Sequence, residues 1–185
     1  MFHQPIARHR LFFAIRPPRV RARQLASAAY WFETEGRAVD AERLHITSFL
    51  LDDLDRLPDE LVARLHGVGD ELSLAPFDVM LDRAVGSDQS IALRPSRRND
   101  GLAELHRQLA VNAHAAGIPE RDKYRFSPHL TLGYRNGASF QQPIAPVGWR
   151  AEEVVLIHSH LGQTRHDLIG RWPLRAAPDP QLALF

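Results

Sequence analysis

The chain has 185 residues, 44% of them hydrophobic, which is enough for one domain or for two small lobes that share a core. A formal net charge of +1 excludes a global basic field for nucleic acid, so an anionic ligand must be held by a local site. The lack of cysteine excludes disulfides, thiolate metal sites and a cysteine nucleophile, and it fits a reducing cytoplasm. No run approaches the ~20 apolar residues of a membrane span, so we expect a cytoplasmic protein without membrane contact.

The first third of the chain predicts a strand, a helix and another strand. Residues 1–9 are expected to form a flexible leader. The apolar run 10–15 is followed by two prolines, which is typical of a buried strand. Apolar residues at helical spacing predict a helix over 19–34, and a second strand is expected over 43–51.

The middle of the chain predicts two helices around a pair of strands. A short helix is expected over 58–67, with strands over 71–81 and 90–93. Asn99 is suited to be the N-cap of the next helix. The apolar side chains of that helix share one face: Leu102, Leu105, Leu109 and Ala113.

The last part of the chain predicts three strands. They are expected over 126–134, 152–160 and, as a short final strand, 170–174. The Gly- and Pro-containing stretch 136–149 is interpreted as a loop. We therefore expect one domain over 10–175.

Two of the predicted strands carry the same triplet, His-apolar-Thr, at 45–47 and at 129–131. Because residues i and i+2 of a strand point to one face, each strand presents an imidazole beside a hydroxyl, and its apolar residues face the core. A helix precedes each triplet strand, which favours an α+β architecture of two related halves. We expect the two triplets on facing sheets across a central cleft.

Two imidazoles that converge on one point can act as an acid and a base, because histidine takes either protonation state near neutral pH. This pair suits in-line hydrolysis of a phosphodiester, and the threonine hydroxyls can hold the phosphoryl oxygens. A single triplet is more often structural. Two triplets at matching places in a repeat favour a catalytic site that uses His45, Thr47, His129 and Thr131.

Four segments make the chain similar to a known family: 10–15, 43–50, 126–133 and 172–174. The string Pro-His-Leu-Thr-Leu-Gly within the third segment is the most diagnostic. The chain resembles the two-histidine phosphoesterases, and within them the bacterial RNA 2′,3′-cyclic phosphodiesterases once named 2′-5′ RNA ligases (LigT-like). The resemblance implies an α+β, bilobal fold in which two pseudo-twofold-related lobes, each with a mostly antiparallel sheet and outer helices, flank a central cleft without metal or cofactor.

The resemblance also implies roles for the four residues. His45 would protonate the leaving O3′, His129 would activate water, and Thr47 and Thr131 would bind phosphate. RNA ends or nucleotides with a 2′,3′-cyclic phosphate would yield 2′-phosphomonoesters, and weak 2′-5′ ligation would be the reverse reaction, in which acid and base exchange. The alternative is a module that binds nucleotides or RNA ends without turnover. We expect a monomer.

The chain departs from the family pattern at several places, and two of these departures concern the site. Members often carry Arg directly behind the Gly of the second motif, where Tyr134 stands here and Arg135 follows. Strand alternation turns Arg135 to the face of His129, so Arg135 is the predicted phosphate cation. His166 occupies a position where members often have Tyr.

Two further features leave alternatives open. Phe12 and Phe13 could stack on a nucleobase, although core packing is the favoured interpretation. His158 and His160 share one face of a strand and could bind a metal ion. No third ligand is evident near them, which favours an exposed or cleft-edge role.

The segment 176–185 is expected to be a flexible tail with a peptide motif. The residues at its end are Gln181, Leu182, Leu184 and Phe185. They resemble the Gln-Leu-x-Leu-Phe motif with which bacterial polymerases and repair proteins bind the DNA sliding clamp. The tail could instead fold back over apolar surface of its own domain.

Overall fold

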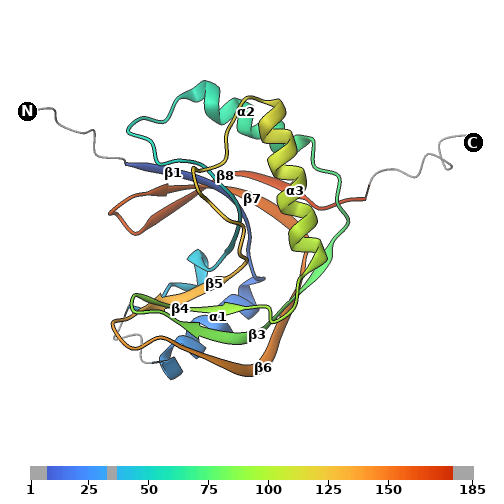
Figure 1. Cartoon of the computed structure of the whole chain (residues 1–185). Helices are drawn as coiled ribbons and strands as arrows, with labels where there is room; N and C mark the ends of the chain where they lie inside the picture. The colour runs from blue at the N-terminus through green and yellow to red at the C-terminus, as the bar shows by residue number, and fades with distance from the viewer. Residues whose placement is uncertain (1–7, 33–36, 177–185) are drawn as a thin grey trace, which may run out of the picture.

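The computed structural model describes residues 8–32 and 37–176, which form an eight-stranded antiparallel sheet with helices packed against it (Figure 1). The elements in chain order are β1 (His9–Ile15), α1 (Arg19–Ala28), the 3-10 helices η1 (Ala29–Phe32) and η2 (Ala41–Arg43), β2 (Ile46–Leu50), α2 (Asp59–Asp70), β3 (Phe77–Gly86), β4 (Ser90–Arg94), α3 (Asp100–Ala115), β5 (Leu130–Tyr134), β6 (Phe140–Ala151), β7 (Glu153–His160) and β8 (Arg165–Pro173).

The strand order β6-β3-β4-β5-β2-β1-β7-β8 divides the sheet into two halves of four strands. The two halves splay apart in Figure 1, and β5 and β2 meet between them at one residue pair, Ile46 with Leu130. The predicted α+β class and the two related lobes are confirmed. The triplet strands are neighbours in one sheet, however, and do not lie on separate facing sheets as expected.

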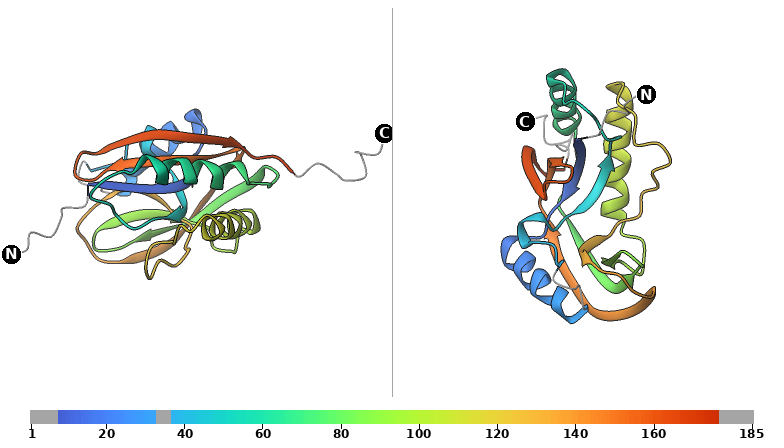
Figure 2. Two further views of the ribbon diagram at one scale, coloured as in Figure 1. Left: turned by 90° about the horizontal axis from the view of Figure 1, so that it is seen from above. Right: turned by 90° about the vertical axis from the view of Figure 1, so that its left-hand side faces the viewer.

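The main core lies between the sheet and the helices. α3 packs against β2 and β3 and so reaches both halves of the sheet, and α2 packs against α3 and β8 (Figure 2). The predicted N-cap of α3 is confirmed, because the Asn99 side chain accepts a hydrogen bond of 2.9 Å from the amide of Leu102. The four predicted apolar residues of this helix are all buried. No helix within the described residues is long and apolar enough to cross a membrane.

β1 is buried on both faces, as its apolar run predicts. Leu11 and Phe13 belong to the main core. Phe12 and Ala14 point the other way and form a second small cluster with β7 and Leu50. The favoured core packing is therefore seen for both phenylalanines, and the ring of Phe12 also contacts His45, as described below.

The prediction of a loop over 136–149 is wrong, because most of this stretch belongs to β6. The prolines Pro143 and Pro146 suggested a loop, since proline cannot donate a hydrogen bond to a sheet. β6 is an edge strand that pairs with β3 alone, and an edge strand tolerates proline.

Other predicted bounds shift by a few residues. β1 begins at His9, within the predicted leader, and β8 begins at Arg165, before the predicted start of the final strand. Both triplet strands are shorter than predicted, and each begins at the residue directly after its histidine. Residues 1–7, 33–36 and 177–185, which include the end of the first predicted helix and nearly all of the predicted tail, lie outside the described residues.

Candidate active site

The two triplets meet at the centre of the sheet. The register pair is formed by their middle residues, Ile46 and Leu130, which are fully buried in the main core. In an antiparallel pair with this register, the histidine of each triplet lies across from the threonine of the other. Alternation then turns all four side chains away from the core. The structure accordingly brings the predicted residues His45, Thr47, His129 and Thr131 together on one cavity of about 680 Å³.

Each triplet strand carries a β-bulge directly after its threonine. In β2 the bulge residue is Ser48, because Thr47 and Phe49 pair with consecutive residues of β1. In β5 it is Leu132, because Thr131 and Gly133 pair with consecutive residues of β4. A bulge bends its strand and increases the local twist. The matching bulges therefore shape both halves of the site in the same way.

Both catalytic candidates are oriented by the same backbone contact. Nδ1 of His45 donates to the carbonyl of Arg43 at 2.6 Å, and Nδ1 of His129 donates to the carbonyl of Ser127 at 2.7 Å. An imidazole that is protonated at Nδ1 keeps a lone pair on Nε2 when it is neutral. Each ring thus has its Nε2 available for proton transfer.

The electrostatic environment favours the neutral form of both rings. Burial lowers the pKa of His45 to about 4, with further lowering by His129, Arg16 and Arg43, and the hydrogen bond to Arg43 opposes the shift. Burial also lowers the pKa of His129, and the nearby Arg94 adds to the effect. A neutral imidazole can accept a proton, so the pair is prepared for base catalysis at neutral pH.

Two aromatic rings enclose His45. The ring of Phe12 stacks on it, with centroids 4.8 Å apart and planes 29° apart. His166 meets both rings edge-on, at 5.5 Å from His45 and 5.8 Å from Phe12. Burial lowers the pKa of His166 to about 4, helped by the charges of His45 and Arg43. His166, at the position where the family often has Tyr, therefore lines the cavity beside the catalytic candidate.

The structure does not bring the predicted cation Arg135 to this cavity. Its guanidinium lies over the ring of Phe140, 5.5 Å from the centroid. The bulge at Leu132 inserts one residue and reverses the alternation that the prediction assumed, so that Tyr134 lines the cavity instead.

The arginines that line the cavity were not singled out by the sequence. They are Arg10, Arg37 and Arg43. Arg10 is held by Asp53 through two hydrogen bonds of 2.7 Å. Nε of Arg43 is buried and has no hydrogen-bond partner among the described residues. The sequence did contain a signal for Arg43. It lies two residues before His45, and strand alternation places residues i and i+2 on the same face.

The comparisons with known proteins cover most of the chain. The model of the 2′-5′ RNA ligase superfamily matches residues 17–163, which include both triplets. The chain belongs to this superfamily. No curated protein sequence matches it. The resemblance to the LigT-like two-histidine phosphoesterases is therefore confirmed at the level of the family.

Several solved structures are similar in fold to this chain. A crystal structure described as a phosphoesterase is 26% identical, with a TM-score of 0.74, and the match covers 91% of this chain and 99% of that chain. LigT of E. coli in complex with 3′-AMP is 25% identical, with a TM-score of 0.73 and coverage of 90% and 98%. TT0787 of Thermus thermophilus is 22% identical, with a TM-score of 0.72, and the match covers 90% of this chain and 98% of that chain. At this identity the match shows only that the two folds are alike.

Proposed function

We propose that the protein hydrolyses the 2′,3′-cyclic phosphates of RNA ends or nucleotides to 2′-phosphomonoesters without a metal ion, and that it catalyses weak 2′-5′ ligation, in which a 5′-hydroxyl takes the place of water. One observation carries the proposal. Two imidazoles, each with Nδ1 bound to the backbone and Nε2 available, share one cavity with two threonine hydroxyls. Membership of the superfamily supports chemistry on phosphoesters.

The proposed reaction uses the pair in opposite protonation states. Nε2 of His129 takes a proton from water as the water oxygen bonds to phosphorus. The bond from phosphorus to O3′ breaks, and protonated His45 gives its proton to that oxygen. Thr47 and Thr131 donate hydrogen bonds to the phosphoryl oxygens and hold phosphorus between the rings. Proton exchange with solvent then restores both histidines.

The substrate itself supplies the charge that the acid requires. The protein alone lowers both pKa values, so it disfavours the imidazolium form. The cyclic phosphate is an anion, and a nearby anion raises the pKa of an imidazole. Arg43, whose Nε lacks a partner among the described residues, is the cation that we expect to contact the phosphate in place of Arg135.

The size and walls of the cavity suit a nucleotide. Its volume of about 680 Å³ lies in the usual range for small-molecule sites, roughly 300–1,000 Å³. Tyr124 and Tyr134 also line it, and their rings offer surfaces on which a nucleobase can stack. The match to LigT, which was solved with 3′-AMP, supports a nucleotide ligand.

The direct test is an assay of 2′,3′-cyclic AMP and of a short RNA with a cyclic end, in the presence of EDTA. We expect a 2′-phosphomonoester as the product, with a rate that chelation leaves unchanged, because imidazoles transfer the protons. A 3′-phosphomonoester, or activity abolished by EDTA, would contradict the proposal. Nucleotide binding without turnover by the wild-type protein would favour the alternative of a binding module.

We infer a sliding-clamp partner from the C-terminal motif alone, whose residues Gln181, Leu182, Leu184 and Phe185 lie outside the described residues. A peptide of residues 176–185 should bind a purified bacterial clamp saturably, with the glutamine and the terminal Leu-Phe filling pockets. The control peptide carries Gln181→Ala and Phe185→Ala, and it should bind at least about tenfold more weakly, a loss that corresponds to ~1.4 kcal/mol. The absence of saturable binding at high micromolar concentration would end this idea.

A further inference from the structure

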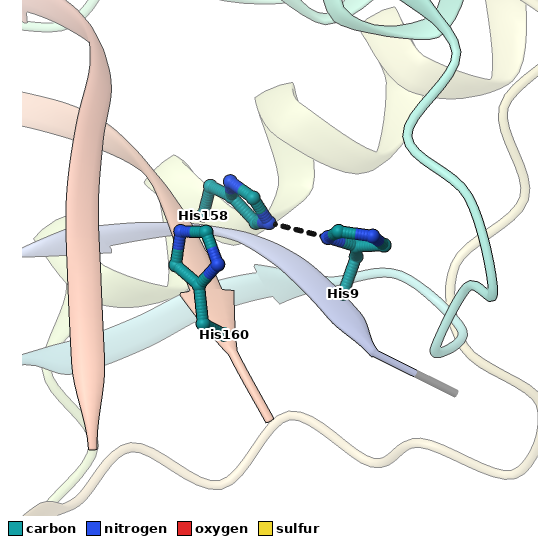
Figure 3. Close-up of side chains that lie close together, drawn as sticks. All are labelled: His9, His158 and His160. Atoms are coloured by element: carbon teal, nitrogen blue, oxygen red, sulfur yellow. Dashed lines mark hydrogen bonds between the residues drawn. The ribbon is translucent and has the colours of Figure 1, made fainter. Parts of the chain in front are cut away.

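Three histidines gather at one end of β1 and β7 (Figure 3). His158 and His160 are the pair that the sequence places on one face of a strand. The register of the sheet adds His9, which pairs directly with His160 across β1 and β7. The third ligand that was not evident in the sequence is therefore supplied by the neighbouring strand, within the predicted leader.

The ring nitrogens of this three-histidine cluster lie close together. One nitrogen from each ring lies within 4.8 Å of one from each of the other two. Nδ1 of His9 and Nε2 of His158 are 2.8 Å apart and share a hydrogen bond. The rings of His158 and His160 have centroids 4.0 Å apart. Zn–N bonds of about 2.0–2.1 Å place tetrahedral ligand nitrogens about 3.3 Å apart, so small side-chain rotations would convert this arrangement into a coordination shell.

A carboxylate orients the third ring from outside the cluster. Nε2 of His160 donates to Oδ2 of Asp167 at 2.7 Å, which leaves Nδ1 of His160 as the possible ligand atom. Asp167 is itself held by two hydrogen bonds from Arg165, of 2.9 and 2.8 Å. A histidine that bonds a carboxylate through its second nitrogen is the usual arrangement at protein zinc sites, because it sets the tautomer and the ring orientation.

The chemistry of the cluster suits a metal ion better than a purely structural contact. His158 is only 6% exposed, and its hydrogen-bond partner is another imidazole rather than a carboxylate or the backbone. Neutral imidazoles without thiolates select zinc-class divalent ions over magnesium or calcium.

We propose that His9, His158 and His160 bind one divalent transition-metal ion of the zinc class, with water as the fourth ligand. Asp167 positions the ring of His160. The ion would join β1 to β7 and fix the start of the turn after β7, whose residues Leu161 and Gly162 line the cavity.

The three-histidine cluster reaches the edge of the cavity through His160, which is one of its lining residues, but the proposed acid and base are His45 and His129. Alternation along β1 places His9 on the face of Leu11 and Phe13, whereas Phe12 points to the cavity and stacks on His45. The proposed hydrolysis assigns its two proton transfers to His45 and His129 and none to this cluster. The expected effect of the ion is on binding and on thermal stability, so failure of this inference leaves the proposed function intact.

The test is a titration of the full-length, tag-free protein, stripped of metal, with Zn²⁺ by calorimetry and with Co²⁺ by visible absorption. We expect one ion per chain, d–d absorption bands of a tetrahedral or five-coordinate Co²⁺ site, and a rise in Tm with Zn²⁺. His9→Ala should remove saturable binding. Asp167→Asn should weaken binding about 10–100-fold, the usual cost of losing such an outer partner.

The matched control is His114→Ala, which removes an exposed histidine of α3 and should leave the affinity unchanged. Circular dichroism of each metal-free variant establishes that it is folded. If His9→Ala does not fold, the test uses Asp167→Asn in its place. The proposal is overturned if the wild-type protein takes up no ion at about 100 micromolar Zn²⁺, a concentration on the order of the Kd of a weak adventitious site. Equal affinity in the wild type and in either cluster variant would also overturn it.

Discussion

Replacing either His45 or His129 by alanine is expected to lower kcat for hydrolysis of a 2′,3′-cyclic nucleotide by about 10²–10⁴-fold, the usual contribution of one acid or base. Each variant loses the imidazole that its triplet strand brings to the cavity. The two rings serve one step, so the double variant should lose far less than the product of the two single losses. Initial rates with 2′,3′-cyclic AMP give kcat for the two single variants and the double variant.

The binding of the product separates lost chemistry from lost structure. Both histidine variants should bind 2′-AMP within about threefold of the wild type, because the proposed phosphate ligands Thr47, Thr131 and Arg43 are unchanged. The exposed His114→Ala provides a control with unchanged kcat. A histidine variant that is folded and retains more than about a tenth of the wild-type kcat would contradict the acid–base assignment.

Acid is expected to destabilise the fold well above the pH at which carboxylates titrate. The unfolded chain binds a proton at His45 near pH 6.5, whereas burial in the folded state lowers that pKa to about 4. Between these values the unfolded state holds more protons, so the free energy of unfolding falls as the pH falls from 6.5 to 4. The shift at His45 corresponds to roughly 3–4 kcal/mol at most, because one pKa unit is about 1.4 kcal/mol.

Urea unfolding of the wild type and of His45→Gln at pH 7 and at pH 4.5 measures this contribution. Glutamine cannot take up the proton, so the variant should lose clearly less stability between the two pH values than the wild type. The difference between the two pH dependences separates His45 from the carboxylates, and it includes the effect of His45 on the neighbouring His166, whose pKa burial also lowers to about 4. Parallel pH dependences would show that the ring of His45 is protonated as easily in the folded protein as in the unfolded chain.

The predictions that failed share a physical cause. Arg135 was assigned to the cavity by simple alternation, which the bulge at Leu132 reverses, and a bulge is defined by the partner strand rather than by its own residues. The segment 136–149 was assigned to a loop because its prolines disfavour a central strand, and only the sheet order shows that β6 lies at an edge.

The amino-acid sequence by itself determined much of the local structure and the residue types of the candidate site. It placed α3 with its N-cap at Asn99, the buried run of β1 and the two triplets, since these follow from periodicity and residue type over a few positions. Only the tertiary structure decided which distant residues meet. His9 and His158 bond across 149 positions, and the triplets meet at the single pair of Ile46 with Leu130. Strand register is a long-range property, because each strand can pair in several ways until packing of the whole core selects one.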